Sequence, residues 1–166
     1  MFTPDTSSSE SSEHYYQSLN EQLAALLAGE TDLICNAAQF SAFIMQTLDD
    51  LNWAGFYFAR NNELVLGPYV GKVACTRIPF GRGVCGKAAM TATTQCIANV
   101  HEFEGHIACD AASASELVVP IFVGETLLGV FDIDSPSVAR FSEVDQTGIQ
   151  VLLATFLQAT TVQWSI

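Results

Sequence analysis

Residues 53–69 read WAGFYFARNNELVLGPY and decide the fold class. Residues 53–60 are rich in aromatic side chains, as β-strands are, and residues 63–69 form a second strand-like run. Asn61-Asn62 between them suits a tight turn, because asparagine tolerates the left-handed backbone of a two-residue loop. The stretch therefore predicts an antiparallel hairpin.

Strand patterns continue beyond this hairpin. Further elements are expected at residues 72–78, 95–100, 116–123 and 127–134 as strands, with a short helix at 84–91. The two strands 116–123 and 127–134 form a second hairpin, whereas residues 101–114 have no hydrophobic pattern. A long loop of this kind inside a compact domain is often functional.

Helices are expected at both ends of the chain. Leucines repeat at helical spacing over residues 13–28, and Ser142-Glu-Val-Asp145 resembles a capping box before a helix that runs to about residue 161. A second helix, capped by Thr31 or Asp32, would place one set of side chains on a common side: Ile34, Ala38, Ile44 and Leu48. Short turns between strands and helices at both ends predict an α+β domain with a mostly antiparallel sheet.

The composition narrows the class of protein. The 166 residues suggest a flexible tail at 1–12 and one domain over 13–166. Eighteen acidic against six basic residues give a net charge of −12, which argues against nucleic acid or an anionic membrane as partner. The polar N-terminus lacks the features of a signal peptide, and no apolar run approaches the ~18 residues of a membrane span. We expect a cytoplasmic protein.

The five cysteines need separate interpretations. An odd number in a reducing compartment does not indicate a disulfide framework. Cys35 and Cys96 lie among apolar residues of a helix and a strand, where a small core residue is expected. Cys75 in a strand and Cys85 in a short helix, taken singly, also fit a core, but Cys109 lies in the patternless loop.

Acidic and aromatic residues fall on predicted strands, where alternate residues share a face. Trp53, Gly55 and Tyr57 share one face, and the glycine leaves space over the sheet. Asp132 and Asp134 share a face with Leu128 and Val130. Such acids are costly to bury without partners, and a solvated strand end is the alternative interpretation.

The position of Glu116 depends on the turn between the last two strands. A two-residue turn at Gly124-Glu125 would pair it with Ile133, on the opposite face from the aspartates. A three-residue turn that includes Thr126 would pair it with Asp134, on the same face. The pattern alone leaves both open.

A metal site is the other chemistry that these residue types suggest. The candidate ligands are His101, His106, Cys109 and Asp110. Their spacing matches no standard zinc pattern, and the sequence contains neither a G-x-S-x-G nor a phosphate-binding G-x-x-x-x-G-K motif. We therefore expect no metal.

Four motifs together resemble the free methionine-(R)-sulfoxide reductases, single-domain enzymes of the GAF fold. They are 52-NWAGFYF-58, 66-LGPYVGKVACTRIPFGRGVCG-86, 105-GHIACDAASASE-116 and 129-GVFDIDS-135. The similarity covers essentially everything after the N-terminal tail. Cysteines ten and then twenty-four residues apart, with the DxD strand, separate this family from sensory GAF domains.

The resemblance implies a role for each candidate residue. Cys109 would attack the sulfoxide sulfur, Cys75 would resolve the sulfenic acid, and Cys85 would pair with Cys109 or relay the disulfide. The remaining residues would bind substrate or supply the acid: Glu116, Asp132 and Asp134, with Trp53 and Tyr57 as an aromatic wall. The family pattern also favours the turn that puts Glu116 beside Asp134.

The same resemblance implies the reaction. A carboxylate would hold the ammonium group of free methionine sulfoxide, and a protonated carboxyl would donate to the sulfoxide oxygen. Thioredoxin or a similar dithiol would be the electron donor, with no bound cofactor and with a homodimer as one expected assembly. The alternative is a GAF module that binds a small ligand or senses redox state without catalysis.

Overall fold

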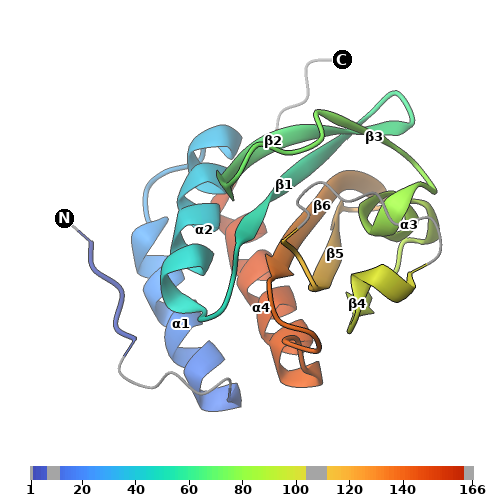
Figure 1. Ribbon diagram of the computed structural model, residues 1–166. Coiled ribbons are helices and arrows are strands. Elements are labelled where there is room, and N and C mark those ends of the chain that lie inside the picture. Colours follow the sequence, from blue (N-terminus) through green and yellow to red (C-terminus); the bar gives the residue numbers. More distant parts are fainter. Residues whose placement is uncertain (1, 7–11, 104–111, 163–166) are drawn as a thin grey trace.

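The computed structural model describes residues 2–6, 12–103 and 112–162 (Figure 1). The helices are α1 (Glu13–Leu26), α2 (Leu33–Thr47), α3 (Gly83–Thr91) and α4 (Glu143–Ala159), with a 3₁₀ turn η1 (Val100–Glu102). The strands are β1 (Trp53–Arg60), β2 (Glu63–Gly71), β3 (Arg77–Pro79), β4 (Gln95–Ile97), β5 (Ser115–Val123) and β6 (Thr126–Ser135).

The strands form one antiparallel sheet in the order β3-β2-β1-β6-β5-β4. The hairpin expected from residues 53–69 is confirmed, since Arg60 pairs with Glu63 across the turn. Asn61 and Asn62 both have positive φ, 50° and 66°, as a two-residue loop of this kind requires. The α+β class with a mostly antiparallel sheet is confirmed.

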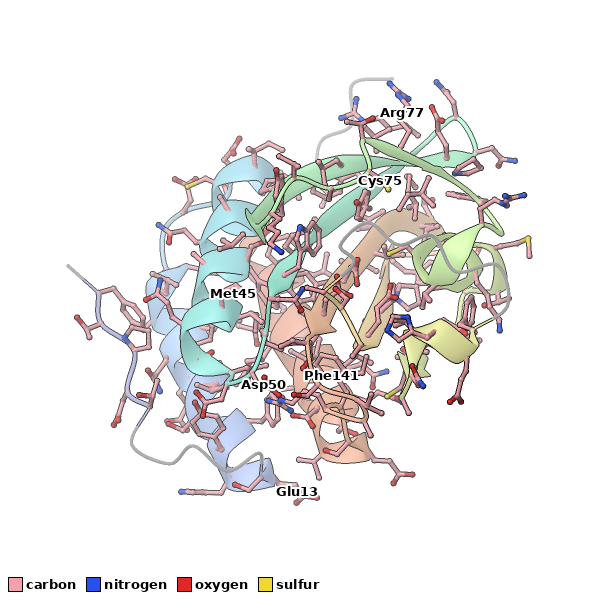
Figure 2. All side chains as sticks on the ribbon, viewed as in Figure 1. Glu13, Met45, Asp50, Cys75, Arg77 and Phe141 are labelled. Carbon is pink, nitrogen blue, oxygen red and sulfur yellow. The ribbon has the colours of Figure 1, made fainter. Side chains whose placement is uncertain are left out.

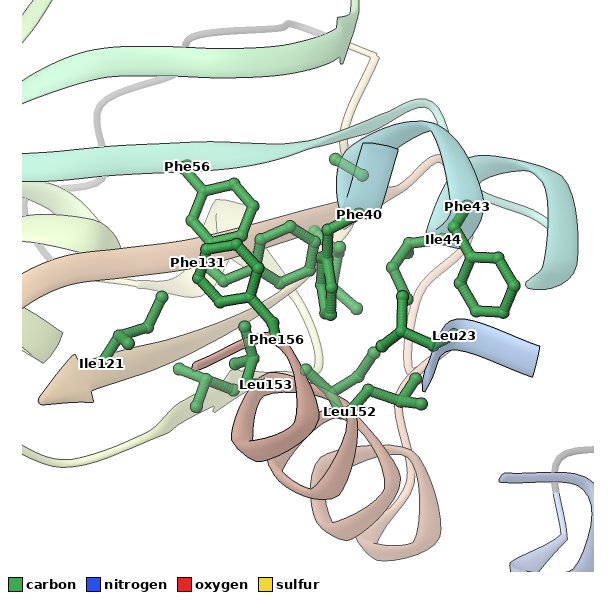
Figure 3. Packing of buried hydrophobic residues seen from close by; sticks show 14 of the residues in the cluster. Leu23, Phe40, Phe43, Ile44, Phe56, Ile121, Phe131, Leu152, Leu153 and Phe156 are labelled. Carbon is green, nitrogen blue, oxygen red and sulfur yellow. The ribbon is translucent and has the colours of Figure 1, made fainter. Parts of the chain in front are cut away.

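One face of the sheet is covered by α1, α2 and α4, which together enclose the main hydrophobic core (Figures 1 and 3). Phe40 of α2 lies at its centre, with its ring edge-on to Phe131 at a centroid distance of 4.8 Å and to Phe56 and Phe156 at 5.6 Å. Each fully buried ring of this size contributes roughly 1.5–3 kcal/mol by leaving water. This layer therefore supplies most of the apolar burial.

The inward face of α2 differs from the expected one. Ile34 is 55% exposed and Ala38 is also exposed, whereas Phe40 and Ile44 are fully buried. The helix is capped by Asp32, whose carboxylate accepts a 2.8 Å hydrogen bond from the Cys35 backbone. The large aromatic ring governs the rotation of the helix, because burying it removes more apolar surface from water than burying Ile34 would.

A second, smaller cluster lies on the opposite face, between the sheet and α3. It contains Trp53 and Tyr57 of β1, Val130 of β6, and Val84 and Ala88 of α3. The residues of the two predicted aromatic and acidic groups are on this face. The sheet thus separates a helix-covered core from the candidate site.

The β5–β6 register combines the two expected alternatives: the pairing of Glu116 with Asp134 is confirmed, but the turn expected to produce it is not. Val123 pairs with Thr126, so the loop has two residues, yet Glu116 pairs with Asp134. The register shifts by one residue because Leu128 is an extra residue in β6, a β-bulge. Leu128 therefore lies in the helix-side core rather than beside the aspartates, which corrects the expected shared face.

Glycine is required next to this bulge. A Cβ on Gly129 would collide with the carbonyl oxygen of Tyr57 and lie 2.8 Å from the Cα of Phe58. Both are backbone atoms of the neighbouring strand β1, so neither can move aside easily. The bulge and its glycine together set which β6 residues face the site.

The expected strand at residues 72–78 is largely a loop. Only Arg77–Pro79 forms β3, at the edge of the sheet, and Cys75 precedes it in irregular backbone. Side chains take the place of strand pairing here: the Trp53 indole donates to the Lys72 carbonyl and the Tyr57 hydroxyl donates to the Cys75 carbonyl. The expected strand at 95–100 is likewise shorter, ending at Ile97 before η1.

The two ends of the domain are fixed by side-chain bonds. Of the predicted tail, residues 2–6 and 12 are described: Asp5 exchanges hydrogen bonds with Gln22 of α1, and Ser12 caps that helix. The predicted capping box at α4 is confirmed: Ser142 and Asp145 bond each other's backbone N–H. None of the described helices combines the length and apolar character needed to cross a bilayer.

Candidate active site

Three aromatic rings form a wall over the first two strands. Trp53 stacks on Tyr69 of β2 at a centroid distance of 5.3 Å and on Tyr57 at 5.9 Å. Gly55 lies between them, and a Cβ there would approach the Trp53 ring to 2.7 Å and also collide with Tyr69. The glycine therefore lets the rings close over the sheet rather than leaving an empty space, as the sequence suggested.

The wall also holds the loop that carries Cys75. The Trp53 indole N–H donates to the Lys72 carbonyl at 3.2 Å. The Tyr57 hydroxyl donates to the Cys75 carbonyl at 3.0 Å. Cys75 is half-buried and packs against the site-face cluster. Both predicted wall residues thus hold the backbone of a candidate redox cysteine, one at Cys75 itself and one three residues before it.

Three acidic side chains meet beside the wall. Asp132 and Asp134 of β6 and Glu116 of β5 are 6%, 8% and 6% exposed. Gly55 pairs with Asp132 and Trp53 with Asp134 across β1 and β6, and Glu116 pairs with Asp134 across β5 and β6. The acids are therefore buried, which excludes the solvated strand end considered from the sequence.

Cys85 closes the acidic cluster from the other side. Its thiol donates to Asp132 Oδ2 at 3.2 Å and lies 3.8 Å from Glu116 Oε1. Cys85 is in the first turn of α3, which the chain can place close to the sheet because Gly86 approaches the Pro79 carbonyl with no room for a Cβ. A side chain at that glycine would push α3, and the thiol, away.

Burial raises the pKa values of Asp132, Glu116 and Cys85 and so favours their protonated forms. Burial raises the pKa of Asp132 to about 7. Burial raises the pKa of Glu116 well above its usual value, and the charges of Asp132 and then Asp134 add to the effect. The Cys85 thiol, also buried and facing Asp132, has a pKa well above its usual value. At neutral pH the cluster therefore retains protons that exposed carboxyls would have lost.

Glu116 and Asp132 share one of these protons. Protonated Glu116 is the donor of a side-chain hydrogen bond to Asp132. With both carboxyls ionised, Asp132 Oδ1 has no hydrogen-bond partner among the described residues. Of the two aspartates, Asp132 has the larger influence on Glu116, although Asp134 is its cross-strand neighbour.

The same three groups are the place where a metal ion could bind. Ligand atoms of Cys85, Glu116 and Asp132 lie within 4.8 Å of one another. One thiolate and two carboxylates suit Zn²⁺, but each group must first lose its proton. This group differs from the candidate ligands that the sequence suggested. Of those candidates, the structure describes only His101, and His101 is not in the group.

The predicted nucleophile, Cys109, lies outside the described residues, as do His106 and Asp110. The chain on either side of that segment is anchored near the acids. Ala114 N–H donates to the Ser135 carbonyl at 2.7 Å, and Val100 N–H to the Ala114 carbonyl at 2.9 Å. Asn52 Nδ2 also donates to Ser113 Oγ at 3.0 Å.

Sequence reasoning missed two residues and misplaced two cysteines. Tyr69 completes the wall, and its alternation with Gly67 and Gly71 in β2 was the available signal. Asn52 stands before β1 and carried no periodic signal. Cys35 and Cys96 are exposed rather than core residues, because Cys35 is on the outward side of α2 and Cys96 is on the edge strand β4.

Comparison with known proteins agrees with this geometry. The GAF domain model matches residues 21–159. A free methionine-R-sulfoxide reductase of Escherichia coli is 50% identical over 84% of this chain and 85% of its own. This chain belongs to the free methionine-R-sulfoxide reductase family of GAF domains.

Two further family members support the assignment. The Saccharomyces cerevisiae free methionine-R-sulfoxide reductase is 43% identical over 75% of this chain and 73% of its own. The solved free methionine-R-sulfoxide reductase of Neisseria meningitidis, in complex with its substrate, has a TM-score of 0.90. It is 37% identical to this chain, of which it covers 96%, and 95% of its own chain is covered.

Proposed function

We propose that this protein reduces free L-methionine-(R)-S-oxide to methionine with its own thiols. One observation carries the proposal: a buried thiol and three buried acids adjoin an aromatic wall on one sheet face. Relatives named free methionine-R-sulfoxide reductase agree with it. The acids would serve the ammonium group and the sulfoxide oxygen of the substrate, and the wall would hold its S-methyl group.

Asp132 is the proposed ligand of the substrate ammonium. Apart from protonated Glu116, its Oδ1 has no hydrogen-bond donor among the described residues, so a bound ammonium would supply one once Glu116 gives its proton to the sulfoxide oxygen. The S-methyl group would lie against Trp53 and Tyr57, whose rings are buried and already stacked. A peptide-bound methionine has no free ammonium and would leave Asp132 unpaired, which disfavours it by the usual cost of a buried charge.

Glu116 is the proposed general acid. Its raised pKa keeps it protonated at neutral pH, so it can donate to the sulfoxide oxygen as the S–O bond breaks. The Cys109 sulfur attacks the sulfoxide sulfur, the oxygen leaves the substrate and is transferred to Cys109, and free methionine departs. Cys109 is thereby oxidised to a sulfenic acid while the substrate sulfur is reduced by two electrons.

Cys75 is the proposed resolving thiol. It attacks the sulfenic acid of Cys109, forming a disulfide and releasing water. A dithiol such as thioredoxin then returns two electrons and two protons. Cys85 is less suited to act as the first nucleophile, because burial, together with the charges of Asp132 and Glu116, raises its pKa and disfavours the thiolate.

The test is methionine production with dithiothreitol as the reductant and no added metal. Free methionine-(R)-S-oxide should be reduced, and the S epimer should be reduced more slowly because its oxygen would point away from Glu116. N-acetylated methionine sulfoxide should be reduced at least tenfold more slowly, roughly the discrimination that one unpaired buried charge provides. Absence of methionine from the free R epimer would overturn the proposal. Equal rates with the N-acetylated compound would overturn the role given to Asp132.

A further inference from the structure

The positive charges of this acidic protein are concentrated in one part of the sequence. Residues 64–101 contain no aspartate or glutamate but carry Lys72, Arg77, Arg82 and Lys87. The rest of the chain holds all eighteen acids and only two arginines, for a net charge of −16. Solubility alone does not require such a division, because interspersed charges serve it equally well.

The fold distributes most of these cations along the β2–β3 side of the sheet, with Lys72 just beyond the end of β2 that is opposite the first hairpin. Arg60 and Arg77 lie at the first hairpin, where Arg60 pairs with Glu63 in register and Arg77 forms an ion pair with the same glutamate. Backbone bonds from Phe80 to Asn62 and from Arg82 to Pro79 keep the start of α3 at that hairpin. We name these residues the basic edge, and its members, all exposed, are Arg60, Lys72, Arg77 and Arg82. Lys87 of α3 is also exposed, but its ammonium lies over the Phe103 ring, 4.9 Å from the centroid, and is not part of this edge.

Cys75 lies within the basic edge. It is three residues after Lys72 and two before Arg77, and Figure 2 shows it beside Arg77 on the same side of the molecule. Its neighbour Val73 is 84% exposed. Cys85, by contrast, is 4% exposed beneath α3. Of the site cysteines that the structure describes, Cys75 is therefore the one that a second protein can approach.

We propose that the basic edge docks a negatively charged protein dithiol and presents Cys75 to it. The inference rests on the proposed function, because it concerns how the Cys75–Cys109 disulfide is reduced. Complementary charge raises the rate of encounter between two proteins by 10- to 1,000-fold at low salt, by steering rather than by tight contact. A protein of net charge −12 would otherwise repel an acidic reductant.

The partner would reduce the Cys75–Cys109 disulfide by thiol–disulfide exchange in two steps. The thiolate of the partner attacks the Cys75 sulfur, and the Cys75–Cys109 bond breaks to release Cys109 as a thiolate. The second partner thiol then attacks the mixed disulfide and releases Cys75. The partner ends as a disulfide, and this protein gains two electrons and, from solvent and partner, two protons.

The experiment measures reduction of the oxidised protein directly. The protein is oxidised with stoichiometric peroxide, and its reduction is followed with two reductants, a thioredoxin of net negative charge and dithiothreitol. The Lys72→Gln/Arg82→Gln variant removes two positive charges from the basic edge. The matched control, Gln17→Glu/Gln158→Glu, makes the same change in net charge at exposed positions of α1 and α4.

The variant should be reduced by thioredoxin about 3- to 10-fold more slowly at low salt, and the difference should vanish near roughly 0.5 M salt. Dithiothreitol rates should be unchanged, and the control should match wild type. An equal thioredoxin rate for variant and wild type would overturn the proposal, as would an equal slowing with dithiothreitol. Dithiothreitol-driven methionine formation by wild type, measured separately, reports on the proposed function itself.

Discussion

Asp132 faces a thiol and a second carboxyl in a buried cluster, and its charge is therefore costly. Burial raises its pKa from the usual range near 3.9 to about 7. The folded protein thus binds more protons than the unfolded chain between about pH 4 and 7. The stability that protonated Asp132 contributes is fully present below about pH 4, the pKa of an aspartate in the unfolded chain. It is lost as the pH rises through about 7, the pKa of Asp132 in the folded protein.

Replacing Asp132 with asparagine should remove this loss of stability at high pH. Asp132→Asn should be more stable than wild type at pH 8, by on the order of 2–4 kcal/mol, and close to wild type at pH 4. Urea unfolding of both proteins across this range gives the difference. A difference that is the same at both ends of the range would show that Asp132 does not titrate in this window.

Serine variants of the three site cysteines should differ in how much methionine they release in a single turnover without reductant. Cys109→Ser should release no methionine, because the acceptor of the oxygen is gone. Cys75→Ser should release about one methionine per protein but recycle poorly with thioredoxin. Cys85→Ser should retain the burst, since the raised pKa of Cys85 disfavours its thiolate. If Cys109→Ser still released methionine in a single turnover and Cys85→Ser did not, Cys85 rather than Cys109 would be the nucleophile.

Glu116 and Asp134 should differ in how much they contribute to the rate of the chemical step, although they pair directly across β5 and β6. Glu116→Gln should slow the chemical step by on the order of 10²- to 10⁴-fold, because an amide cannot supply the proton. Asp134→Asn should have a smaller effect, since Glu116 bonds Asp132 and is influenced less by Asp134. Rapid-quench rates at saturating substrate test this, and equal losses in both variants would contradict the assignment.

At the scale of elements, the β6 bulge determines which acids reach the site. Gly129→Ala should destabilise the protein by roughly 3 kcal/mol or more, because its Cβ meets backbone atoms of β1. Gly124→Ala is the matched control: φ is also positive there, but no atom lies within 4 Å of the new Cβ. It should cost only about 1–2 kcal/mol. Equal losses by chemical denaturation would show that the close approach does not matter.

The same bulge explains what could be predicted at this scale. The first hairpin was predictable because Asn61-Asn62 fixes both the loop and the register. In the second hairpin the loop and the register are set separately, by Gly124 and by the extra residue Leu128, so no turn length could give both the loop and the pairing. The loop at Cys75 was mistaken for a strand because tertiary bonds from Trp53 and Tyr57 replace the strand pairing.

At the scale of the whole molecule, the two faces of the sheet have different tasks. The helix-covered face buries the large aromatic and aliphatic core around Phe40 (Figure 3). The opposite face buries Asp132, Glu116 and Cys85, groups that are costly to remove from water. Apolar burial on the helix-covered face stabilises the domain and offsets the cost of burying polar groups on the site face. Functional sites commonly carry such a local cost that the rest of the fold offsets.

The candidate site could be predicted as a set of residue types but not as a geometry. Alternation placed Trp53, Tyr57, Asp132 and Asp134 on strands, and these four do share the site face. The contact of Cys85 with Asp132 joins residues 47 positions apart, and no local pattern encodes it. The exposure of Cys96 likewise depends on β4 lying at the sheet edge, a property of the assembled fold.

The most direct test mixes fully reduced wild-type protein with free methionine-(R)-S-oxide in the absence of any reductant, and counts both methionine and thiols. The account predicts about one methionine per protein, released together with the loss of two thiols, with Cys75 and Cys109 linked in the product. Methionine formed without loss of thiols, or no methionine from a folded and fully reduced protein, would contradict it.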